Sequence, residues 1–503
     1  MNPIFNCPWS SLVAKKFYIT TAIDYPNGTP HMGHAYEKVV TDCYARWNRL
    51  LGHETHFLTG TDENGQKLVE SAQKSGTPTK EYVDAQVAGF RELCQKLNLS
   101  HDDFIRTTEK RHADVASDFW RKLEAKGDIY FGSYSGKYCL ACESFYTELQ
   151  APDGICPDHK SELALKEEEG FFFKMSKYED FILKFLRSNP QFVVPKNSYN
   201  EVLKRLEAEP LRDLAISRPN KDAWGIPVPG NEKFIMYTWF DALINYYSAL
   251  DEKQREFWPA DVHVIGKDII WFHCVIWPCM LNALDLPLPK QVYVHGMILA
   301  EDGRKMSKSL GNGVDPSDML SKYPLDTFRY YLLRAISAQS DGSFSEQELI
   351  DKHNNELGND YGNLIMRVVK LSLKHLPAEI EGAGIEKQFD FGDVFERMKT
   401  AMDKREHNRA LDALWEYVNK ANQYVNDSEP WKLKNDPEAL KPVVYNCLYA
   451  IHGLACLISP FLPHTGPATL ASLGVQASSF DTIKFGETSY TLSEPSALFP
   501  KIM

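Results

Sequence analysis

The sequence predicts an α/β protein in which a doubly wound parallel sheet is interrupted by an insertion and followed by a helical bundle. Three observations predict this fold class. A β-rich run, a tight loop, a helical stretch and a second strand follow one another near the N-terminus. Paired cysteines stand in a central stretch of short β-like pieces, and the last third of the chain has helical periodicity with few strand candidates.

Length and composition limit the class of protein. At about 100–200 residues per domain, a chain of 503 residues is expected to form three or four units. Hydrophobic residues make up 43% and charged residues 25%, values that exclude collagen-like and disordered proteins. The formal net charge of −12 excludes a polyanion binder with a generally basic surface, although it leaves room for a local basic groove.

We expect neither secretion nor a membrane span. Residues 1–16 contain only short apolar pieces, unlike a secretory signal. The most apolar stretch, 443–463, contains Asn446, His452 and Pro460, so we expect a buried helix there and no membrane partner. A cytoplasmic protein in a reducing compartment follows, where clustered cysteines bind metal more often than they form disulfides.

The opening unit has the pattern of a βαβ motif. Residues 17–23 form a β-rich run that ends in a loop rich in proline and glycine. Residues 31–51 place apolar side chains at three- and four-residue steps, and Gly52 follows them. A second strand is predicted at 56–60. Ligands of such parallel sheets bind at the carboxyl ends of the strands.

The middle of the chain changes character between residues 126 and 224. Short β-like pieces and cysteine-containing turns indicate an insertion. Strands then return at 234–238, 262–265 and 291–295 with helices between them, as though the parallel sheet resumes. From about 345 to 473 the helical period predicts a bundle.

Two motifs carry the chemistry. Pro30-His31-Met32-Gly33-His34 stands where the first strand turns into its helix, and the N–H groups and dipole of a helix N-terminus favour an anion. Gly33 lets a nucleotide approach the backbone closely. Lys305-Met306-Ser307-Lys308-Ser309 combines two cations with small neighbours, which suits a mobile loop that binds phosphates. Taken alone, the first motif also fits a helix cap, and the second also fits a solvated run of charged residues.

Together the two motifs resemble the signature motifs of the class I aminoacyl-tRNA synthetases. The KMSKS sequence is complete, and HMGH differs from the usual HIGH only in its apolar second residue. The resemblance implies ATP-dependent activation of an amino acid as an aminoacyl-adenylate, followed by transfer to the end of a tRNA. It also implies that His31, His34, Lys305 and Lys308 hold the ATP phosphates and stabilise the pentavalent α-phosphate. The residues implied to bind ATP, which is accompanied by Mg²⁺, are His31, Gly33, His34, Gly266, Asp268, Lys305 and Lys308, with Asp268 on the ribose.

Further matches extend the resemblance over nearly the whole chain and point to the methionyl-tRNA synthetase branch. ATP, L-methionine and tRNA(Met) are then the implied substrates, for translation initiation and elongation. The units implied by the resemblance are the first Rossmann-like catalytic half at 1–125, the connective insertion with its zinc knuckle at 126–224, the second catalytic half at 225–300, the KMSKS loop and stem-contact region at 301–344, and the anticodon-binding bundle at 345–503.

The paired cysteines predict a structural zinc site. Its four ligands would be Cys139, Cys142, Cys156 and His159, in two close-spaced pairs. Thiolates and an imidazole in such pairs suit a closed tetrahedral Zn²⁺ site, one per chain. Since four protein ligands leave no open position, the metal should brace the insertion and not activate water. Chance pairing of buried free cysteines is the alternative.

The methionine pocket is carried over from the family residue by residue. The residues implied to bind methionine are Ile23, Tyr25, Asp62, Trp239, Ala242, Leu243, Tyr246, Ile269, Phe272 and His273. Asp62 would pair with the substrate ammonium group, and the aromatic set would hold the thioether, which is only a weak acceptor. We expect homocysteine to be a partial substrate. Asp24 departs from the family, which commonly has Pro beside the Tyr, and its role is open.

The helical end also matches the family. Asn359, Asn363 and Arg367 recur at a spacing of four residues, which places them on one face of a helix. Pro430-Trp431 adds a flat ring on which a base can stack. In the family these positions recognise the CAU anticodon, whereas the spacing alone also fits a polar solvent-facing stripe.

Two other functions compete with this one. One is a class I synthetase for another amino acid: leucine, isoleucine and valine enzymes carry a long inserted editing domain, and a cysteine enzyme is shorter and uses zinc within its pocket. A catalytically silent tRNA-binding relative would have no need for phosphate ligands at both motifs. Because only about 30 residues follow Leu473, we expect a monomer without an appended oligonucleotide-binding module.

Overall fold

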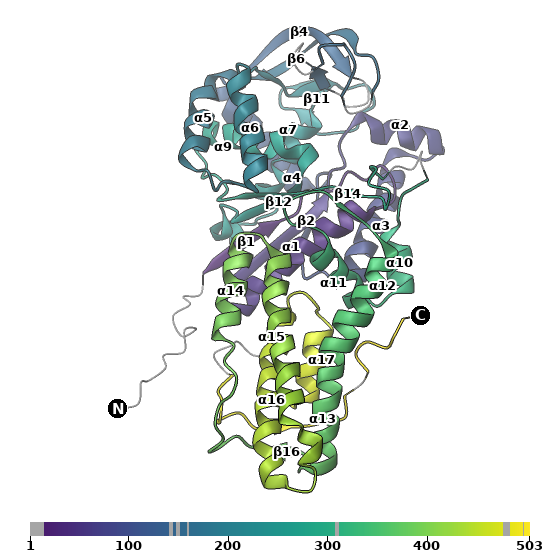
Figure 1. Cartoon of the computed structure of the whole chain (residues 1–503). Helices are drawn as coiled ribbons and strands as arrows, with labels where there is room; N and C mark the ends of the chain where they lie inside the picture. The colour runs from purple at the N-terminus through teal and green to yellow at the C-terminus, as the bar shows by residue number, and fades with distance from the viewer. Residues whose placement is uncertain are drawn as a thin grey trace.

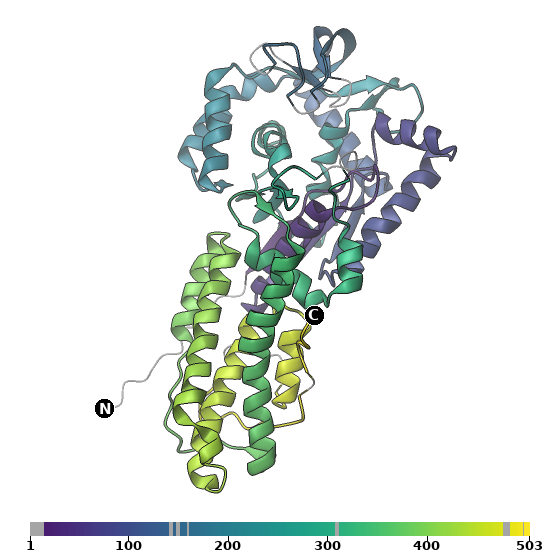
Figure 2. The same ribbon diagram turned by 45° about the vertical axis from the view of Figure 1, so that its right-hand side comes forward.

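The computed structural model describes residues 15–139, 144–146, 151–157, 160–306, 311–475, 483–495 and 497–502. They form an elongated molecule with an α/β part above, capped by the insertion, and a helical bundle below (Figure 1). The turned view shows the same two parts, with the helices of the bundle running away from the sheet (Figure 2). The predicted α/β class with a parallel sheet and a helical C-terminal domain is confirmed.

A parallel sheet of six strands forms the centre of the α/β part. Its order is β3-β2-β1-β12-β13-β7, and every neighbouring pair is parallel. In that order the strands are Asp103–Arg106, Glu54–Thr61, Lys16–Thr20, Val262–Gly266, Val292–His295 and Val193–Val194. β12 and β13 follow the insertion, so the sheet is split in sequence as predicted. β7 lies within residues 126–224 and adds an edge strand to the sheet that the insertion interrupts.

Strand β1 ends at Thr20, three residues before the predicted end. Beyond it the backbone bonds to both neighbouring strands: Thr21 N donates to Leu58 O and Ala22 N donates to Val264 O, both at 3.0 Å. Asp24 N then donates to Gly60 O at 2.9 Å. The chain therefore stays extended between β2 and β12 as far as Asp24, which brings residues 22–25 to the carboxyl ends of the strands.

The sheet has an apolar core on each face because its side chains alternate. On one face Phe17, Ile19 and Phe57 pack with helix α1 and the bundle. On the other, Tyr18 and Leu58 pack with helices α4 (Lys110–Ala125) and α9 (Trp277–Ala283) and with the insertion. Burial on both faces is what a parallel sheet requires.

Helix α1 spans Met32–Leu50, in agreement with the helix predicted at 31–51, and Gly52 follows it with φ of +78°. It lies between the sheet and the bundle, and most of its side chains are buried, including those of Glu37, Lys38 and Asp42. Helices α2 (Gln66–Ser75) and α3 (Thr79–Lys96) follow β2.

The insertion differs in part from the prediction. Strands β5 (Ser144–Tyr146), β4 (Ile129–Cys139), β6 (Ala164–Phe173) and β8 (Leu214–Ala215) form an antiparallel sheet in that order. Two helices accompany it, α5 (Glu179–Ser188) and α6 (Lys196–Ala208), which the prediction of only short β-like pieces missed. The phenylalanines of α5 gave the stretch a β-like composition. Only Ile182 and Leu186 of α5 are buried, and their spacing of four residues fits a helix and not a strand.

One predicted strand belongs to another sheet. The strand expected at 234–238 is β11 (Asn231–Met236), which pairs antiparallel with β9 (Ser217–Pro219) and β10 (Pro227–Val228). The prediction that the parallel sheet resumes there is wrong; it resumes at β12. Two short helices follow β11, α7 (Thr238–Ala242) and α8 (Asn245–Ser248).

The bundle consists of helices joined to the sheet by a short connecting region. That region contains β14 (Ile298–Leu299), paired parallel with β15 (Gly342–Ser343), and helices α10 (Pro316–Lys322) and α11 (Leu325–Ala335). The bundle helices are α12 (Glu346–Lys352), α13 (Asn363–His375), α14 (Gly392–Asp403), α15 (His407–Ser428), α16 (Pro437–Ile458) and α17 (Thr465–Ser472), and β16 (Glu379–Ile380) pairs with β17 (Tyr490–Thr491).

Two features of the bundle bear on the predictions. Helix α16 is long and apolar enough to cross a membrane, yet 83% of its most apolar window is buried, so the predicted buried helix is confirmed. A π-helix, His353–Gly362, separates α12 from α13. Asn359 lies in that π-helix while Asn363 and Arg367 lie in α13, so the three do not share one regular α-helix as predicted.

A buried arginine joins the bundle to the catalytic half. Arg329 of α11 is fully buried and forms an ion pair with Asp42 of α1 at 2.7 Å. Its other N–H groups donate to the carbonyl oxygens of Phe461 and Leu97, both at 3.1 Å. Burial raises the pKa of Asp42, but Arg329 and Arg46 outweigh it, so the net shift is downward. One guanidinium thus joins α1, the end of α3 and the loop after α16.

Replacing this guanidinium should destabilise the whole chain. Arg329→Leu would leave Asp42 buried with only Arg46 as a cation, and breaking a buried pair costs about 3–5 kcal/mol. We expect a clear fall in the urea unfolding midpoint, measured by circular dichroism. Arg49→Leu is the matched control, because Arg49 pairs with Asp102 at 2.7 Å on the same helix but near the surface, where a pair contributes about 0–1 kcal/mol. Equal losses in the two variants would contradict the role of Arg329.

Candidate active site

A cavity of about 240 Å³ opens at the carboxyl ends of the central strands. We call it the strand-end cavity. The residues that line it are Ala22, Ile23, Tyr25, Asp62, Lys67, Tyr237, Thr238, Trp239, Ala242, Leu243, Asn245, Tyr246, Ile269 and His273. Nine of the ten residues predicted to bind methionine are among them. Segments far apart in the sequence therefore converge on one site.

Phe272 is the exception among the predicted residues. It does not line the strand-end cavity, but its ring stacks on Trp239 with 3.9 Å between centroids and 14° between planes. It therefore supports the wall of the cavity from behind. Trp239 in turn presents its indole to the cavity, where flat apolar surface is most useful for binding an apolar ligand.

The buried end of the cavity carries one uncharged polar pair. The Tyr246 hydroxyl lies 2.7 Å from His273 Nε2, and His273 Nδ1 lies 3.0 Å from Ile269 O. A carbonyl oxygen only accepts, so Nδ1 holds the proton and Nε2 accepts from the tyrosine. Burial lowers the pKa of His273 to about 4. The pair is therefore neutral at physiological pH and offers polarity without charge.

The cavity is also lined by a buried carboxylate. Asp62 follows β2, is 5% exposed, and its backbone N–H donates to Asp24 O at 2.8 Å. Lys67 of α2 lines the same cavity. A buried carboxylate beside an apolar cavity is suited to a ligand ammonium group.

Five residues that line the cavity were not predicted. They are Ala22, Lys67, Tyr237, Thr238 and Asn245. Ala22, Thr238 and Asn245 stand directly before predicted residues and Tyr237 is one position further away, so sequence adjacency would have found them. Lys67 lies two positions into α2, and no pattern in the sequence sets it apart from other surface lysines.

The two motif histidines are fixed by hydrogen bonds at the start of α1. His31 is the N-cap, and its Nδ1 accepts from Gly33 N at 3.1 Å. His34 Nδ1 accepts from His31 N at 3.0 Å, so the pair forms a reciprocal capping box. Both rings therefore hold their proton on Nε2 when neutral. The rings stack with 3.7 Å between centroids, and burial, with His31 and Lys38, lowers the pKa of His34 well below its usual value.

Gly33 has a use in this structure in addition to the one predicted. A Cβ at this position would lie 3.0 Å from His31 Cε1. Glycine therefore makes room for the capping imidazole itself, beside any ligand that approaches the helix N-terminus. Two of the N–H groups expected to bind an anion already bond to the histidines.

The remaining predicted ATP residues lie at the ends of β12 and β14. Gly266 ends β12, and a Cβ there would lie 2.7 Å from Asp268 Oδ1, so glycine lets the Asp268 side chain fold over the backbone. Lys305 pairs with Leu299 in an isolated antiparallel bridge. Lys308 lies outside the described residues.

A second buried charge pair stands beneath these residues. Glu37 of α1 accepts from Ala22 N at 2.9 Å and lies 3.0 Å from His295 Nε2. Burial lowers the pKa of His295, but Glu37 and Gly296 O outweigh it, so the net shift is upward. Neither residue was predicted. The pair joins α1 to β1 and β13 directly behind the strand-end cavity.

The residues predicted to read an anticodon lie at the far end of the bundle. Arg367 donates to Asn426 Oδ1 at 2.9 Å, and its guanidinium lies 5.7 Å from the Trp431 ring centroid. Trp431 is 43% exposed, and Asn359 and Asn363 are exposed. An apolar cavity of about 210 Å³ opens beneath Arg367 and Trp431. Four predicted residues are thus available to a ligand at this end.

The predicted zinc site lies only partly in the described chain. Cys139 ends β4 and Cys156 lies in a turn, and both thiols are buried. Cys142 and His159 lie outside the described residues, and the described residues alone contain no cluster of three metal-ligating side chains. Both buried thiols are of the donor type that zinc prefers.

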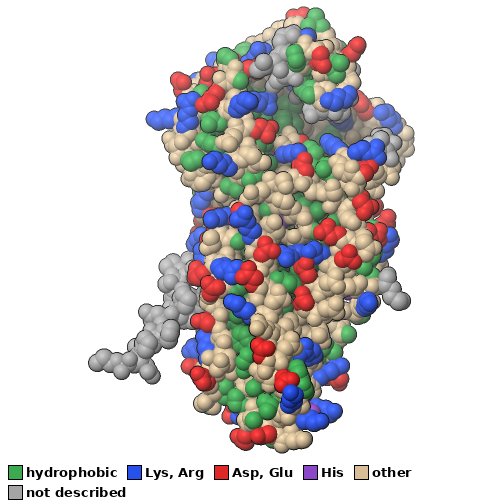
Figure 3. Space-filling view, viewed as in Figure 1, with side chains coloured by type: hydrophobic (Ala, Val, Ile, Leu, Met, Phe, Trp, Pro, Cys, Tyr) green, Lys and Arg blue, Asp and Glu red, His purple; other side chains and the backbone are tan. Residues whose placement is uncertain are grey.

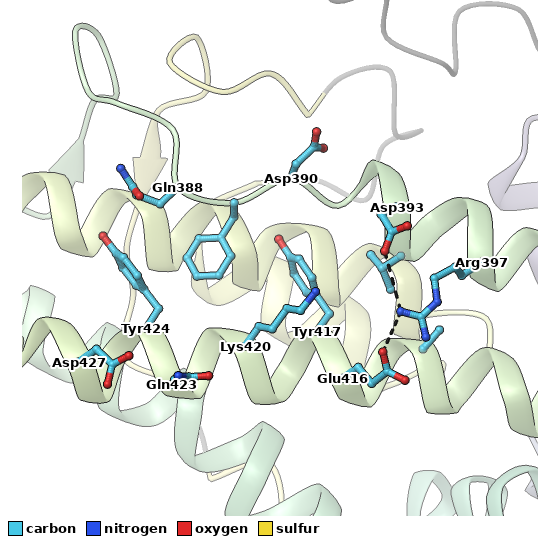
Figure 4. Close-up of a pocket in the computed structure, with 13 residues that line it drawn as sticks. Gln388, Asp390, Asp393, Arg397, Glu416, Tyr417, Lys420, Gln423, Tyr424 and Asp427 are labelled. Carbon is cyan, nitrogen blue, oxygen red and sulfur yellow. Dashed lines mark ion pairs between the residues drawn. The ribbon is translucent and has the colours of Figure 1, made fainter.

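Another cavity, of about 370 Å³, lies between α14, α15 and residues 388–390. Figure 4 shows the Arg397 guanidinium between Asp393 and Glu416, with which it forms ion pairs at 3.8 and 2.7 Å. It contains none of the predicted site residues. Its arginine is already neutralised, so it offers no obvious place for a phosphate.

Comparisons with known proteins agree with one family. The model of class I tRNA synthetases (M) matches residues 17–166 and 158–369, and that of the anticodon binding domain of methionyl tRNA ligase matches 385–502. The methionine–tRNA ligase of Caldanaerobacter subterraneus subsp. tengcongensis is 41% identical over 97% of this chain and 79% of its own. That of Bacillus subtilis is 42% identical over 97% of this chain and 78% of its own.

Solved structures agree as well. The chain superposes with a TM-score of 0.90 on Mycobacterium tuberculosis methionyl-tRNA synthetase in complex with methionyl-adenylate, at 36% identity and over 97% of this chain and 100% of that one. The apo form of the same enzyme superposes with a TM-score of 0.84 at 33% identity, over 98% of this chain and 99% of that one. Given family models that together span most of the sequence and relatives of this identity, the chain belongs to the methionyl-tRNA synthetases of the class I aminoacyl-tRNA synthetase family.

Proposed function

We propose that the strand-end cavity is the methionine site of this methionine–tRNA ligase and that the α1 histidines and the lysine loop hold ATP beside it. The observation that carries the proposal is the convergence of nine predicted residues on one cavity at the carboxyl ends of the strands. Ligands of parallel sheets bind at that edge. The histidines stand at the N-terminus of the helix that follows β1.

The reaction has two steps. A carboxylate oxygen of methionine attacks the α-phosphorus of ATP, the bond from that phosphorus to the bridging oxygen of the β-phosphate breaks, and pyrophosphate leaves. A hydroxyl at the 3′ end of tRNA(Met) then attacks the carbonyl carbon of methionyl-adenylate, and AMP leaves. The substrate supplies the nucleophile, so the protein acts by positioning and by stabilising charge.

Methionine recognition would depend on the shape of the cavity and on the polar groups that line it. Asp62 would pair with the ammonium group, which fixes the carboxylate toward ATP. Trp239, Ala242 and Leu243 would enclose the side chain, with soft sulfur–aromatic contacts of about 0.3–1.5 kcal/mol each. The neutral Tyr246–His273 pair would border the thioether, where a charge would be costly to desolvate.

The tautomers of the histidines suit them to bind phosphate. Because Nδ1 of His31 and of His34 accepts a backbone N–H, each neutral ring carries its donor on Nε2. The two stacked rings would therefore direct N–H groups at negative charge that grows on the α-phosphate. Lys305 and Lys308 would bind the same phosphates, and Asp268 would bond the ribose. Mg²⁺ would arrive with ATP as its counter-ion.

The far end of the bundle would read the anticodon. Trp431 offers a half-exposed ring on which a base can stack, and Arg367 is held beside it by Asn426. Asn359 and Asn363 would add amide groups on the same side, although the π-helix changes their spacing along the axis.

A structural zinc ion would brace the insertion. Cys139 and Cys156 supply two buried thiols, and Cys142 and His159 would complete the set. The metal would join the end of β4 at Cys139 to the segment that contains Cys156, and it would take no part in the chemistry. A reducing cytoplasm is the compartment in which such thiols bind metal, and a monomer remains our expectation.

Pyrophosphate exchange with ATP tests the assignment of the cavity. Across the twenty amino acids, we expect the strongest exchange with methionine. Tyr246→Phe removes the donor to His273 Nε2 and leaves a buried acceptor unpaired, which costs about 1–3 kcal/mol. The KM for methionine should therefore rise about 5- to 150-fold, with little change in the KM for ATP.

Tyr247→Phe is the matched control for this variant. Tyr247 is the next residue, does not line the strand-end cavity, and contacts Arg255 through its ring face, which the substitution keeps. Its kinetics should match those of the wild type. Stronger exchange with another amino acid, or an unchanged KM in Tyr246→Phe, would contradict the assignment.

Trp431→Ala should weaken tRNA charging without affecting methionine activation. Loss of a base-stacking ring costs about 1–3 kcal/mol, so kcat/KM for tRNA(Met) should fall about 5- to 150-fold while exchange without tRNA stays normal. Trp431→Phe keeps a flat ring and should recover most of the loss. Loss of exchange in both variants would instead place Trp431 in folding.

Metal analysis tests the zinc proposal. Mass spectrometry of metals should find one zinc per chain in the wild type and much less in Cys156→Ser. Cys94→Ser is the control, because Cys94 is also a buried thiol but lies in α3, away from the insertion. Wild-type protein without zinc but with full thermal stability would refute the site.

A further inference from the structure

Asp24, whose role the sequence left open, lies at the junction of the two substrate sites. Its backbone N–H donates to Gly60 O at 2.9 Å and its carbonyl accepts from Asp62 N at 2.8 Å. The backbone is therefore clamped to the end of β2, beside the carboxylate that lines the strand-end cavity. Its side chain is 4% exposed and points to α1.

Two groups of α1 meet the Asp24 carboxylate. Lys38 Nζ lies 2.5 Å from Asp24 Oδ2 and is fully buried. His34 Nε2 lies 3.9 Å from Asp24 Oδ1. Since His34 Nδ1 accepts from His31 N, the atom that faces Asp24 carries the imidazole proton. The imidazole is thus anchored at one nitrogen by the backbone and faces a carboxylate at the other.

Stability alone does not account for a fully buried lysine–aspartate pair. Taking both charges from water costs several kcal/mol per ion, and apolar residues of similar volume are often as stable or more so. The pair stands behind a histidine that meets ATP, where a fixed charge changes what that histidine can do.

We propose that Asp24, held by Lys38, is a positioning residue for His34 during adenylate formation. This inference rests on the proposed function. The carboxylate attracts the Nε2–H edge of the His34 ring, whose tautomer the His31 N–H sets, and so orients the ring. It also offsets the positive field of Lys38, which would otherwise oppose any gain of positive charge on the imidazole. Charge that grows on the α-phosphate then meets a donor whose tautomer and direction are already set.

The charge of Asp24 should depend on pH near neutrality. Burial raises its pKa to about 6, although Lys38 opposes the shift. The groups that surround this pair are His31, His34 and Glu37 of α1, Asp62 after β2, Cys94 of α3 and His101 after α3. As the pH falls through about 6, Asp24 gains a proton and no longer acts on His34, so the rate of activation should fall.

Asp24→Asn tests the proposal, because an asparagine oxygen still accepts from Lys38 but carries no charge. In pyrophosphate exchange, kcat should fall about 10- to 100-fold, as for other residues that orient a functional histidine. The KM for methionine should stay within about twofold of the wild type. The acid limb near pH 6 should disappear from the profile of kcat. Asp102→Asn is the control, since Asp102 pairs with Arg49 of the same helix but far from His34, and it should keep the wild-type profile.

The Lys38→Met variant provides a second measurement, which would not change if Asp24 had a purely structural role. It removes the cation that lowers the pKa of Asp24, so the acid limb should shift to higher pH. Unfolding midpoints check that each variant folds. Wild-type kcat and acid limb in folded Asp24→Asn, or an unmoved limb in folded Lys38→Met, would overturn the inference. Absence of methionine-dependent exchange in the wild type would overturn the proposed function on which it rests.

Discussion

The structure depends on the buried charges of helix α1. This helix lies between the sheet and the bundle, where apolar side chains alone would suffice for packing, yet it carries Glu37, Lys38 and Asp42. Each meets a partner from a distant segment: His295, Asp24 and Arg329, respectively. Because an unpaired buried charge is costly, each pair fixes α1 against one part of the molecule. These pairs therefore also fix the position of the histidines at the N-terminus of α1.

Local patterns in the sequence predicted much of the fold, and the resemblance to a family supplied the cavity residues. The βαβ unit, the return of the sheet and the bundle follow from periodicity, whereas the nine cavity residues were carried over from family motifs. Pairings across the fold could not be predicted in this way. Asp24 and Lys38 lie on different elements, β7 has two residues and too little pattern to detect, and the phenylalanines of α5 gave that helix a β-like composition. The π-helix also has no sequence period that separates it from α13.

A net charge of −12 is unusual for a protein that binds RNA, because RNA is itself negatively charged. The distribution of charge on the surface explains how the two can bind. On the face in Figure 3, acidic and basic side chains are interspersed, with no broad field of one sign. Affinity that came from phosphate neutralisation alone would need such a field and would be non-specific. In the proposed function, the groups that meet tRNA therefore act locally, through the exposed ring of Trp431 and the guanidinium of Arg367 beside it. Acidic surface elsewhere discourages other RNA.

Helix α15 sets the distance between helix α1 and the far end of the bundle. Helix α15 begins at His407, whose ring lies against Tyr36 and Tyr44 of α1, and near its other end Asn426 accepts from Arg367. At about 1.5 Å per residue, these ends are roughly 30 Å apart. Burial lowers the pKa of His407 to about 3, so this contact stays neutral and does not loosen over the physiological pH range. In the proposed function, a tRNA that is read at one end and charged at the other must span that length, and α1, whose N-terminus carries the histidines proposed to bind ATP, is the element against which α15 is held.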